Sequence, residues 1–256
     1  MNVSMRYAES WESFWRDAPP GAGSVAWDAA PDSTAALHLP LLERYSHGGL
    51  PMIDAGCGNG TQTLFLAERY PRVLGFDLSG EAVERAAKAA EAAREELGER
   101  GRAGRGGQAP RVEFRQLDAT DLAAVRELHD ELGDADVYMR GVLHQAQPDD
   151  RRTVASSLAA LIGERGCALV VEPAAAAKQV MLRLMGREEG PPPQLEAIFG
   201  HGIEPMDMPD EELPAYFRGE GLTVLASGTM PLSLTVSEED GSYVTLPSNW
   251  LVASRV

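Results

Sequence analysis

A glycine-rich turn between an apolar run and a helical pattern constrains this chain more than any other stretch. Residues 52–70 read MIDAGCGNGTQTLFLAERY, with glycine at the alternate positions Gly56, Gly58 and Gly60. Because glycine lacks a Cβ, a backbone of this kind can turn tightly and approach a ligand closely. A strand, a glycine turn and a helix in this order are typical of α/β domains that hold nucleotide-like cofactors at the carboxyl edge of a parallel sheet.

The rest of the chain alternates apolar runs with helical patterns. Strands separated by helices of ordinary length predict a parallel sheet with right-handed crossovers. We therefore expect an α/β fold with a doubly wound, mostly parallel, seven-stranded sheet and helices on both faces. The expected strands begin at residue 52 and continue at 72–79, 111–118, 135–143, 167–173, 222–230 and 248–256.

Two segments fall outside this alternation. Residues 1–45 precede the first strand and are rich in aromatic side chains, so we expect them to form an N-terminal helical cap or lid. Residues 46–256 are expected to form the main domain. Within it, residues 174–210 are rich in methionine and interrupted by prolines, and we expect them to be an insertion that covers the substrate.

The charge balance argues against several partners. The chain has 39 acidic and 23 basic residues and a net charge of −16. Nucleic-acid binding needs clustered Lys and Arg, and the basic stretch 98–110 is glycine-rich without aromatics, which indicates a surface loop. No apolar run approaches the ~20 residues that span a bilayer, and the N-terminus lacks the pattern of a secretion signal. We expect a cytoplasmic protein that contacts neither nucleic acid nor membrane.

The glycine spacing argues against a dinucleotide. The nicotinamide fingerprint Gly-x-Gly-x-x-Gly places its third glycine inside the helix. Started at Gly56 or Gly58, that pattern requires glycine where the chain has Thr61 or Thr63. The chain instead has Asp54 at the strand end, where a carboxylate is poorly suited to a pyrophosphate and well suited to an ammonium group.

Acidic residues also end the next two expected strands. Asp77, in GFDLS, lies about twenty positions past the glycine turn, where a carboxylate can accept hydrogen bonds from a ribose diol. Asp118, in QLDAT, can accept from an adenine amino group. Asp77 alone does not distinguish NAD from S-adenosylmethionine.

Four stretches, DAGCGNG, GFDLS, QLDAT and DADVYMRGVLH, follow one another at successive strand ends. Together, over residues 50–175, they resemble the class I S-adenosylmethionine-dependent methyltransferases, which have a Rossmann-like fold. The resemblance implies S-adenosylmethionine as cofactor, with its ribose on Asp77 and its adenine near Asp118 and Ala119. The full set of implied cofactor contacts is Asp54, Gly56, Gly58, Gly60, Asp77, Leu78, Asp118, Ala119, Met139 and Arg140.

A histidine and a glutamate are the candidates for catalysis. His144 follows the fourth expected strand and Glu172 ends the fifth. These strands are neighbours in this topology, so both side chains should share one rim, where a carboxylate fixes the tautomer of an imidazole and stabilises its protonated form. Residues 140–173 resemble small-molecule O-methyltransferases of the caffeate and polyketide type, whose catalytic histidine and acidic partner fall on these positions. Those enzymes commonly have an acidic residue or histidine where this chain has Gln145.

The expected reaction is methyl transfer to a small molecule of secondary metabolism, at a hydroxyl oxygen with His144 as general base. The sequence leaves open an N-, S- or C-methyltransferase that works by proximity alone, and a non-catalytic S-adenosylmethionine-binding protein. A dehydrogenase is disfavoured because no Tyr-x-x-x-Lys pair follows the fourth strand. Met139 and Arg140 offer no acidic ligands, so we predict no metal. Monomer and homodimer both remain open.

Overall fold

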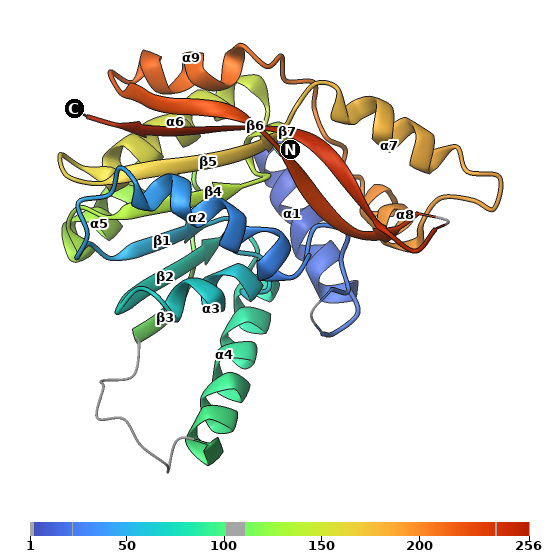
Figure 1. The fold of residues 1–256 in the computed structure, drawn as a ribbon, viewed down its shortest axis with the longest axis horizontal. Coiled ribbons are helices and arrows are strands. Elements are labelled where there is room, and N and C mark those ends of the chain that lie inside the picture. Colours follow the sequence, from blue (N-terminus) through green and yellow to red (C-terminus); the bar gives the residue numbers. More distant parts are fainter. Residues whose placement is uncertain (1–2, 22, 101–110, 239, 256) are drawn as a thin grey trace.

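One mixed sheet forms the centre of the computed structural model, which describes residues 3–21, 23–100, 111–238 and 240–255 (Figure 1). The strands of this sheet are β1 (Met52–Ala55), β2 (Arg72–Asp77), β3 (Arg111–Gln116), β4 (Asp136–Arg140), β5 (Cys167–Pro173), β6 (Thr223–Ser237) and β7 (Tyr243–Ser254). Their spatial order is β3-β2-β1-β4-β5-β7-β6. The first five run parallel and β7 runs antiparallel to both of its neighbours. The expected seven-stranded, mostly parallel sheet is confirmed. Most of the basic stretch 98–110 lies outside the described residues.

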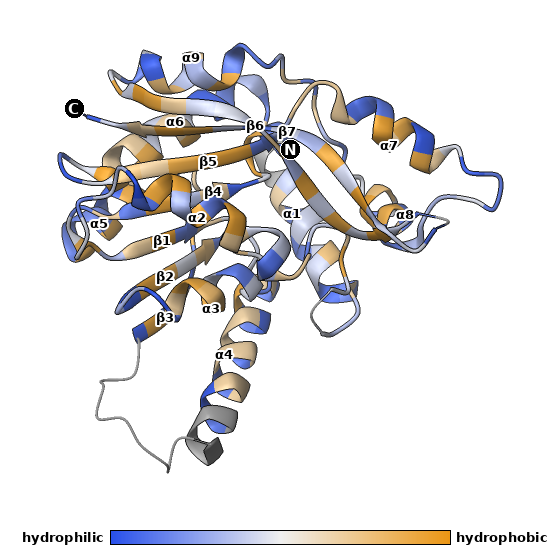
Figure 2. Ribbon diagram, viewed as in Figure 1, coloured by the Kyte–Doolittle hydropathy of each residue, from blue (hydrophilic) through white to orange (hydrophobic). Residues whose placement is uncertain are grey.

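Helices cover both faces of the sheet, so the central strands are apolar along their length. Every residue of β1 is buried, and Figure 2 shows the apolar character of the central strands. One face packs against α2 (Ala35–Glu43), α3 (Thr61–Ala67) and α4 (Gly80–Arg100), and the other against α5 (Leu122–Leu132), α6 (Pro148–Ile162) and α9 (Glu212–Gly219). This doubly wound arrangement is the Rossmann-like fold that the sequence predicted.

The helix starts follow from local chemistry. Asp121 precedes α5, and its carboxylate accepts hydrogen bonds from the backbone N–H groups of Ala123 and Ala124, which caps the helix. α6 begins at Pro148, a position where the backbone N–H that proline lacks would have no partner within the helix. Two acidic residues in the first turn interact favourably with the positive end of the helix dipole. The position of α6 matters for the site because the turn before it follows β4.

The strand order reverses between β1 and β4. Crevices of this kind, at the carboxyl ends of parallel strands, are where open α/β sheets bind ligands. The turn after β1 is held against β2, because Gly56 N and Cys57 N donate to Phe76 O at 2.8 and 2.9 Å. The sheet therefore brings the ends of β1, β2, β4 and β5 to one edge.

The two closing strands are longer than the sequence predicted. They form a hairpin of 15 and 12 residues, whereas the sequence indicated only residues 222–230 and 248–256. Proline lacks the N–H that a strand ladder uses, and Pro231 and Pro247 interrupt the two patterns. In the structure these prolines lie opposite each other, so both missing donors fall in a single pair. The extended hairpin carries Leu232, Leu234 and Leu246 toward the site.

The N-terminal segment packs on the main domain through α1 (Val3–Asp17) and an aromatic cluster of Trp11, Phe14, Trp15 and Trp27. Arg85 on α4 fastens it by donating to the carbonyl oxygens of Arg16, Ala18 and Pro19. The 174–210 segment contains α7 (Ala177–Met185) and α8 (Pro193–Gly200), which lie at the same end of the sheet as α1 (Figure 1). Among the described helices, none is long and apolar enough to span a membrane.

Candidate active site

A cavity of about 620 Å³ opens at the carboxyl edge of the sheet, within the ~300–1,000 Å³ typical of ligand sites. Its wall combines the glycine turn, the ends of four strands, α1, and parts of 173–208. The sequence-predicted residues on this wall are Asp54, Gly56, Gly58, Asp77, Leu78, Asp118, Ala119, Met139, Arg140 and His144. Gly60 and Glu172 are absent from the wall, and both stand behind it.

The glycine turn requires glycine for two different reasons. Gly58 has a φ of 53°, and a Cβ there would lie 2.9 Å from the indole ring of Trp15. Gly60 has a φ of 83°, and its Cβ would lie 2.8 Å from Ala86 Cβ on α4. Gly58 therefore lets α1 close over the turn, whereas Gly60 lets the start of α3 pack against α4 rather than against a ligand.

Asp77 joins the glycine turn to the end of β2. Its Oδ2 accepts from Gly58 N and its Oδ1 from Ser79 N, both at 2.9 Å. Burial raises the pKa of this carboxyl. Each carboxylate oxygen has a second lone pair, so the side chain can accept hydrogen bonds from two ligand hydroxyls. Asp118 is oriented by its own turn, in which Thr120 donates to it through N and Oγ1.

Asp54 is a buried carboxyl with few compensating contacts. It is 3% exposed, and Thr63 Oγ1 donates to its Oδ2 at 2.6 Å. Burial raises its pKa to about 6, although Thr63 and the positive charge of Arg140 lower it. Arg140 itself points both of its terminal nitrogens at Trp27 O, 3.0 Å away, and so ties the end of β4 to the N-terminal segment.

The structure places the two catalytic candidates in contact. Glu172, on β5, is 0% exposed, and its Oε2 lies 2.9 Å from His144 Nδ1. The same carboxylate accepts from the backbone N–H groups of Val142, Leu143 and His144 at 2.9, 2.9 and 3.2 Å, which fixes the turn η3 (Leu143–Gln145). Because an ionised carboxylate only accepts, Nδ1 carries the proton and Nε2 has the lone pair.

Gln145 is a site residue whose contact the sequence did not predict. Its Nε2 lies 2.8 Å from His144 Nε2, so the amide donates to the free imidazole nitrogen. Gln145 is 9% exposed, and its Oε1 is buried without a hydrogen-bond partner. The sequence could have indicated Gln145 as a site residue only through its position directly after His144.

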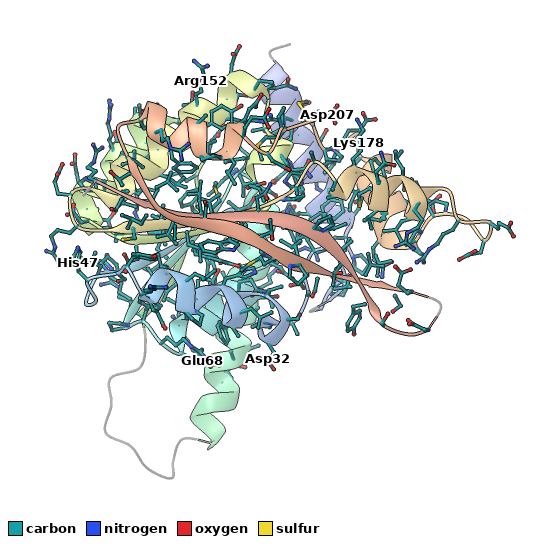
Figure 3. All side chains as sticks on the ribbon, turned by 45° about the horizontal axis from the view of Figure 1, so that its top comes forward. Asp32, His47, Glu68, Arg152, Lys178 and Asp207 are labelled. Atoms are coloured by element: carbon teal, nitrogen blue, oxygen red, sulfur yellow. The ribbon has the colours of Figure 1, made fainter. Side chains whose placement is uncertain are left out.

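The half of the cavity beyond His144 is apolar. Its wall comes from α7, α8, the loop after α8 and the β6–β7 hairpin, which contribute Met181, Leu182, Met185, Leu195, Ile198, Phe199, Met206, Leu232, Leu234 and Leu246. The charged residues among these elements, Lys178, Glu204 and Asp207, are exposed, and Lys178 Nζ lies 2.8 Å from Asp207 Oδ1. Figure 3 shows these two exposed side chains beside each other at the outer edge.

This donor and acceptor set fits a cofactor with a cationic end and an adenosine. Asp54 and Asp77 place two carboxylates beside the turn, and Gly56 and Gly58 of the turn line the same cavity. A diphosphate would bring negative charge against these carboxylates, which Coulomb repulsion disfavours. Among the described residues, no three His, Cys, Asp or Glu side chains lie together in a way that could hold a metal ion.

Comparisons with known proteins concern the fold and the class of enzyme. A family model described as a methyltransferase domain matches residues 52–166. A solved S-adenosylmethionine-dependent methyltransferase from Anabaena variabilis is 29% identical, with a TM-score of 0.82 over 99% of this chain and 95% of that one. No curated protein sequence matches the chain.

Two more distant structures share the fold. Magnesium protoporphyrin IX methyltransferase from Synechocystis PCC 6803, solved with bound S-adenosylhomocysteine, is 17% identical, with a TM-score of 0.58 over 96% of this chain and 93% of that one. A protein that converts a disulfide bond into a thioacetal group during echinomycin biosynthesis is 21% identical, with a TM-score of 0.61 over 99% of this chain and 92% of that one.

The fold, the family-model match and the Anabaena structure together support a class I S-adenosylmethionine-dependent methyltransferase. The chain is accordingly an S-adenosylmethionine-dependent methyltransferase, with S-adenosylmethionine as its cofactor.

Cofactor affinity should depend on pH through Asp54. Its pKa of about 6 means that the carboxyl is protonated below pH 6 and ionised above it. The α-amino group of the cofactor stays cationic at these values, so it pairs with the ionised form. We expect the Kd for S-adenosylhomocysteine to rise as pH falls through 6, by about tenfold per unit at most. Calorimetry from pH 5 to 7, below the range in which the α-amino group loses its proton, measures this. Asp54→Asn should flatten the dependence, and an unchanged profile in that variant would assign it to another group.

Proposed function

We propose that the enzyme methylates a hydroxyl oxygen of a small, apolar molecule, with His144 as general base. The observation that carries this proposal is the 2.9 Å contact between His144 Nδ1 and the buried Glu172, at the boundary between the cofactor half and the apolar half of the cavity.

The chemistry follows from what a hydroxyl acceptor needs. Bound S-adenosylmethionine supplies a methyl group on a sulfonium, which is already activated, so the protein mainly aligns the acceptor and excludes water. A hydroxyl must also lose its proton, and a positioned base contributes about 10²- to 10⁴-fold. His144 Nε2 accepts that proton, and Glu172 stabilises the imidazolium that forms.

The lining indicates the acceptor class. Aliphatic, methionine and phenylalanine side chains from α7, α8 and the β6–β7 hairpin line the apolar half of the cavity, and the charged lining residues that α7 and residues 204–208 contribute, Lys178, Glu204 and Asp207, are exposed. The cofactor and the acceptor share about 620 Å³, so the acceptor is small. An apolar phenol fits both the size and the polarity of this space.

One contact favours a second candidate function. Gln145 Nε2 already donates to His144 Nε2 at 2.8 Å, so the base nitrogen is blocked until the amide moves. If the amide stays in place, His144 shapes the wall, and the acceptor is a group that needs no base, such as a neutral amine or a thiolate. The acceptor atom therefore distinguishes the two candidates.

The test combines a product assay with one substitution. A methyl-labelled donor is offered with a panel of phenols, amines, thiols and carboxylic acids. With a phenol, we expect His144→Ala to lower kcat by about 10²-fold or more at pH 7 because the base is lost, with S-adenosylhomocysteine affinity unchanged. His47→Ala is the matched control, since His47 is exposed (Figure 3). A loss below tenfold with methyl transfer rate-limiting, or a panel in which only amines or thiols react, favours the second candidate.

A further inference from the structure

Arg151 is a buried cation that touches no sequence-predicted site residue through its side chain. It lies in the first turns of α6 and is 1% exposed. Its Nε donates to Leu143 O and Ala146 O, both at 3.0 Å. Its Nη1 donates to Asp207 O at 3.1 Å, and its Nη2 lies 3.5 Å from Met206 O. Glu212, at 3.6 Å from Nη1, is its carboxylate neighbour.

These four carbonyl groups belong to two separate parts of the cavity wall. Leu143 and Ala146 bracket His144 in and after η3. Met206 and Asp207 belong to residues 204–208, which we call the acceptor loop and which line the apolar half and its rim. The guanidinium is thus a bridge between the turn that carries the base and the loop that faces the acceptor.

The acceptor loop is anchored at its two ends by the buried side chains of Ile203 and Met208, and its middle depends on hydrogen bonds. Residues 203–209 have no regular secondary structure, and Glu204, Pro205 and Asp207 are exposed. One further bond joins the loop to η3, from Met206 N to His144 O at 2.8 Å. Lys178 holds the loop from the outside through Asp207, but that ion pair is exposed and therefore contributes little.

The chemistry of the side chain matches this role. A guanidinium presents five donors in a rigid plane, so one residue can hold carbonyl groups from two segments at once. A lysine ammonium in the same place would keep the charge and lose the fork. A methionine would fill the volume and hold neither segment.

We propose that Arg151 is a positioning residue for methyl transfer, which holds the acceptor loop and the His144 turn in one fixed relation. The acceptor then meets the methyl group at the required distance. This inference rests on the proposed function only in placing the acceptor in the apolar half, and it holds for oxygen, nitrogen or sulfur as the acceptor atom.

The test compares Arg151→Met with Arg152→Met, a neighbour on α6 that is exposed (Figure 3). The acceptor is 2-naphthol, or whichever phenol, amine or thiol of the panel reacts fastest. Since misplacement of about 1 Å can cost 10²-fold, we expect Arg151→Met to lower kcat/KM for the acceptor by about that factor. S-adenosylhomocysteine affinity should stay within about twofold, and Arg152→Met should match the wild type.

Two further measurements separate positioning from general stabilisation. In Arg151→Met, amide hydrogen exchange should speed up at Met206, while the β1 amides stay protected. In Arg151→Ala, added guanidinium ion should restore part of the rate, whereas Arg151→Lys should stay impaired. An unchanged kcat/KM in Arg151→Met, or a loss of S-adenosylhomocysteine affinity as large as the loss of rate, overturns the proposal. Both of these outcomes are measured on Arg151→Met, whereas the role of His144 as base is tested by His144→Ala. A failure of the base assignment can therefore be distinguished from a failure of this proposal.

Discussion

Replacement of Glu172 by alanine is expected to abolish measurable methyl transfer and to lower the free energy of unfolding by about 3–5 kcal/mol. The carboxylate is fully buried and accepts from three backbone N–H groups and from His144 Nδ1. Without it, the three N–H groups lose their acceptor, and an unpaired buried donor costs about 1–3 kcal/mol. The η3 turn and the imidazole then lose their orientation together.

Glu172→Gln separates the charge from the volume. The amide keeps one acceptor oxygen and turns an NH₂ group toward groups that are themselves donors, so we expect kcat to fall by about 10²-fold or more through loss of the ordered base. Urea denaturation and turnover with the acceptor found in the panel measure the two effects. Glu68→Gln is the control, because the Glu68 side chain is 72% exposed. Wild-type turnover in Glu172→Gln would contradict the base assignment for His144.

The sequence was sufficient for the arrangement of the strand ends. Parallel strands in this topology bring their carboxyl ends to one edge, so residues that follow them must converge. Asp77 and His144 lie 67 positions apart and line one cavity for this reason. The contact between His144 and Glu172 was predictable in the same way, because β4 and β5 are neighbours.

The remaining contacts could not be predicted from the sequence. The hydrophobic periodicity of a helix or strand indicates which of its faces is buried, but it does not indicate which distant residues that face contacts. Arg151 bonds to Met206, 55 positions away, in a loop without a regular pattern. Glu12 bonds to Ser79 across 67 positions. The β6–β7 hairpin was cut short in the prediction because Pro231 and Pro247 break each strand pattern singly, and their pairing exists only in the folded hairpin.

Removal of residues 1–20 is expected to raise the Kd for S-adenosylhomocysteine by about 100-fold, a loss of about 2.7 kcal/mol. Tyr7, Trp11 and Trp15 line the cavity, and the Trp15 indole lies directly over Gly58. Glu12 accepts from Ser79 Oγ at 2.6 Å and from Glu81 N at 3.3 Å, so α1 is fastened at the start of α4, next to the Asp77 turn. Without this segment, the cofactor side of the cavity opens to water.

Single substitutions keep this prediction testable, because truncation uncovers Trp27 and other apolar groups that pack against α1 and can cause aggregation. Trp15 is 3% exposed and lines the cavity over Gly58, and Trp15→Ala should weaken S-adenosylhomocysteine binding by about 10-fold, or about 1.4 kcal/mol, because the ligand loses contact with the indole. Arg16→Ala is the control, because the Arg16 side chain is 58% exposed and its ion pair with Glu81 is 3.6 Å long. Calorimetry gives both affinities. A soluble truncated protein that binds S-adenosylhomocysteine and turns over like the wild type would show that α1 packs beside the cofactor without enclosing it.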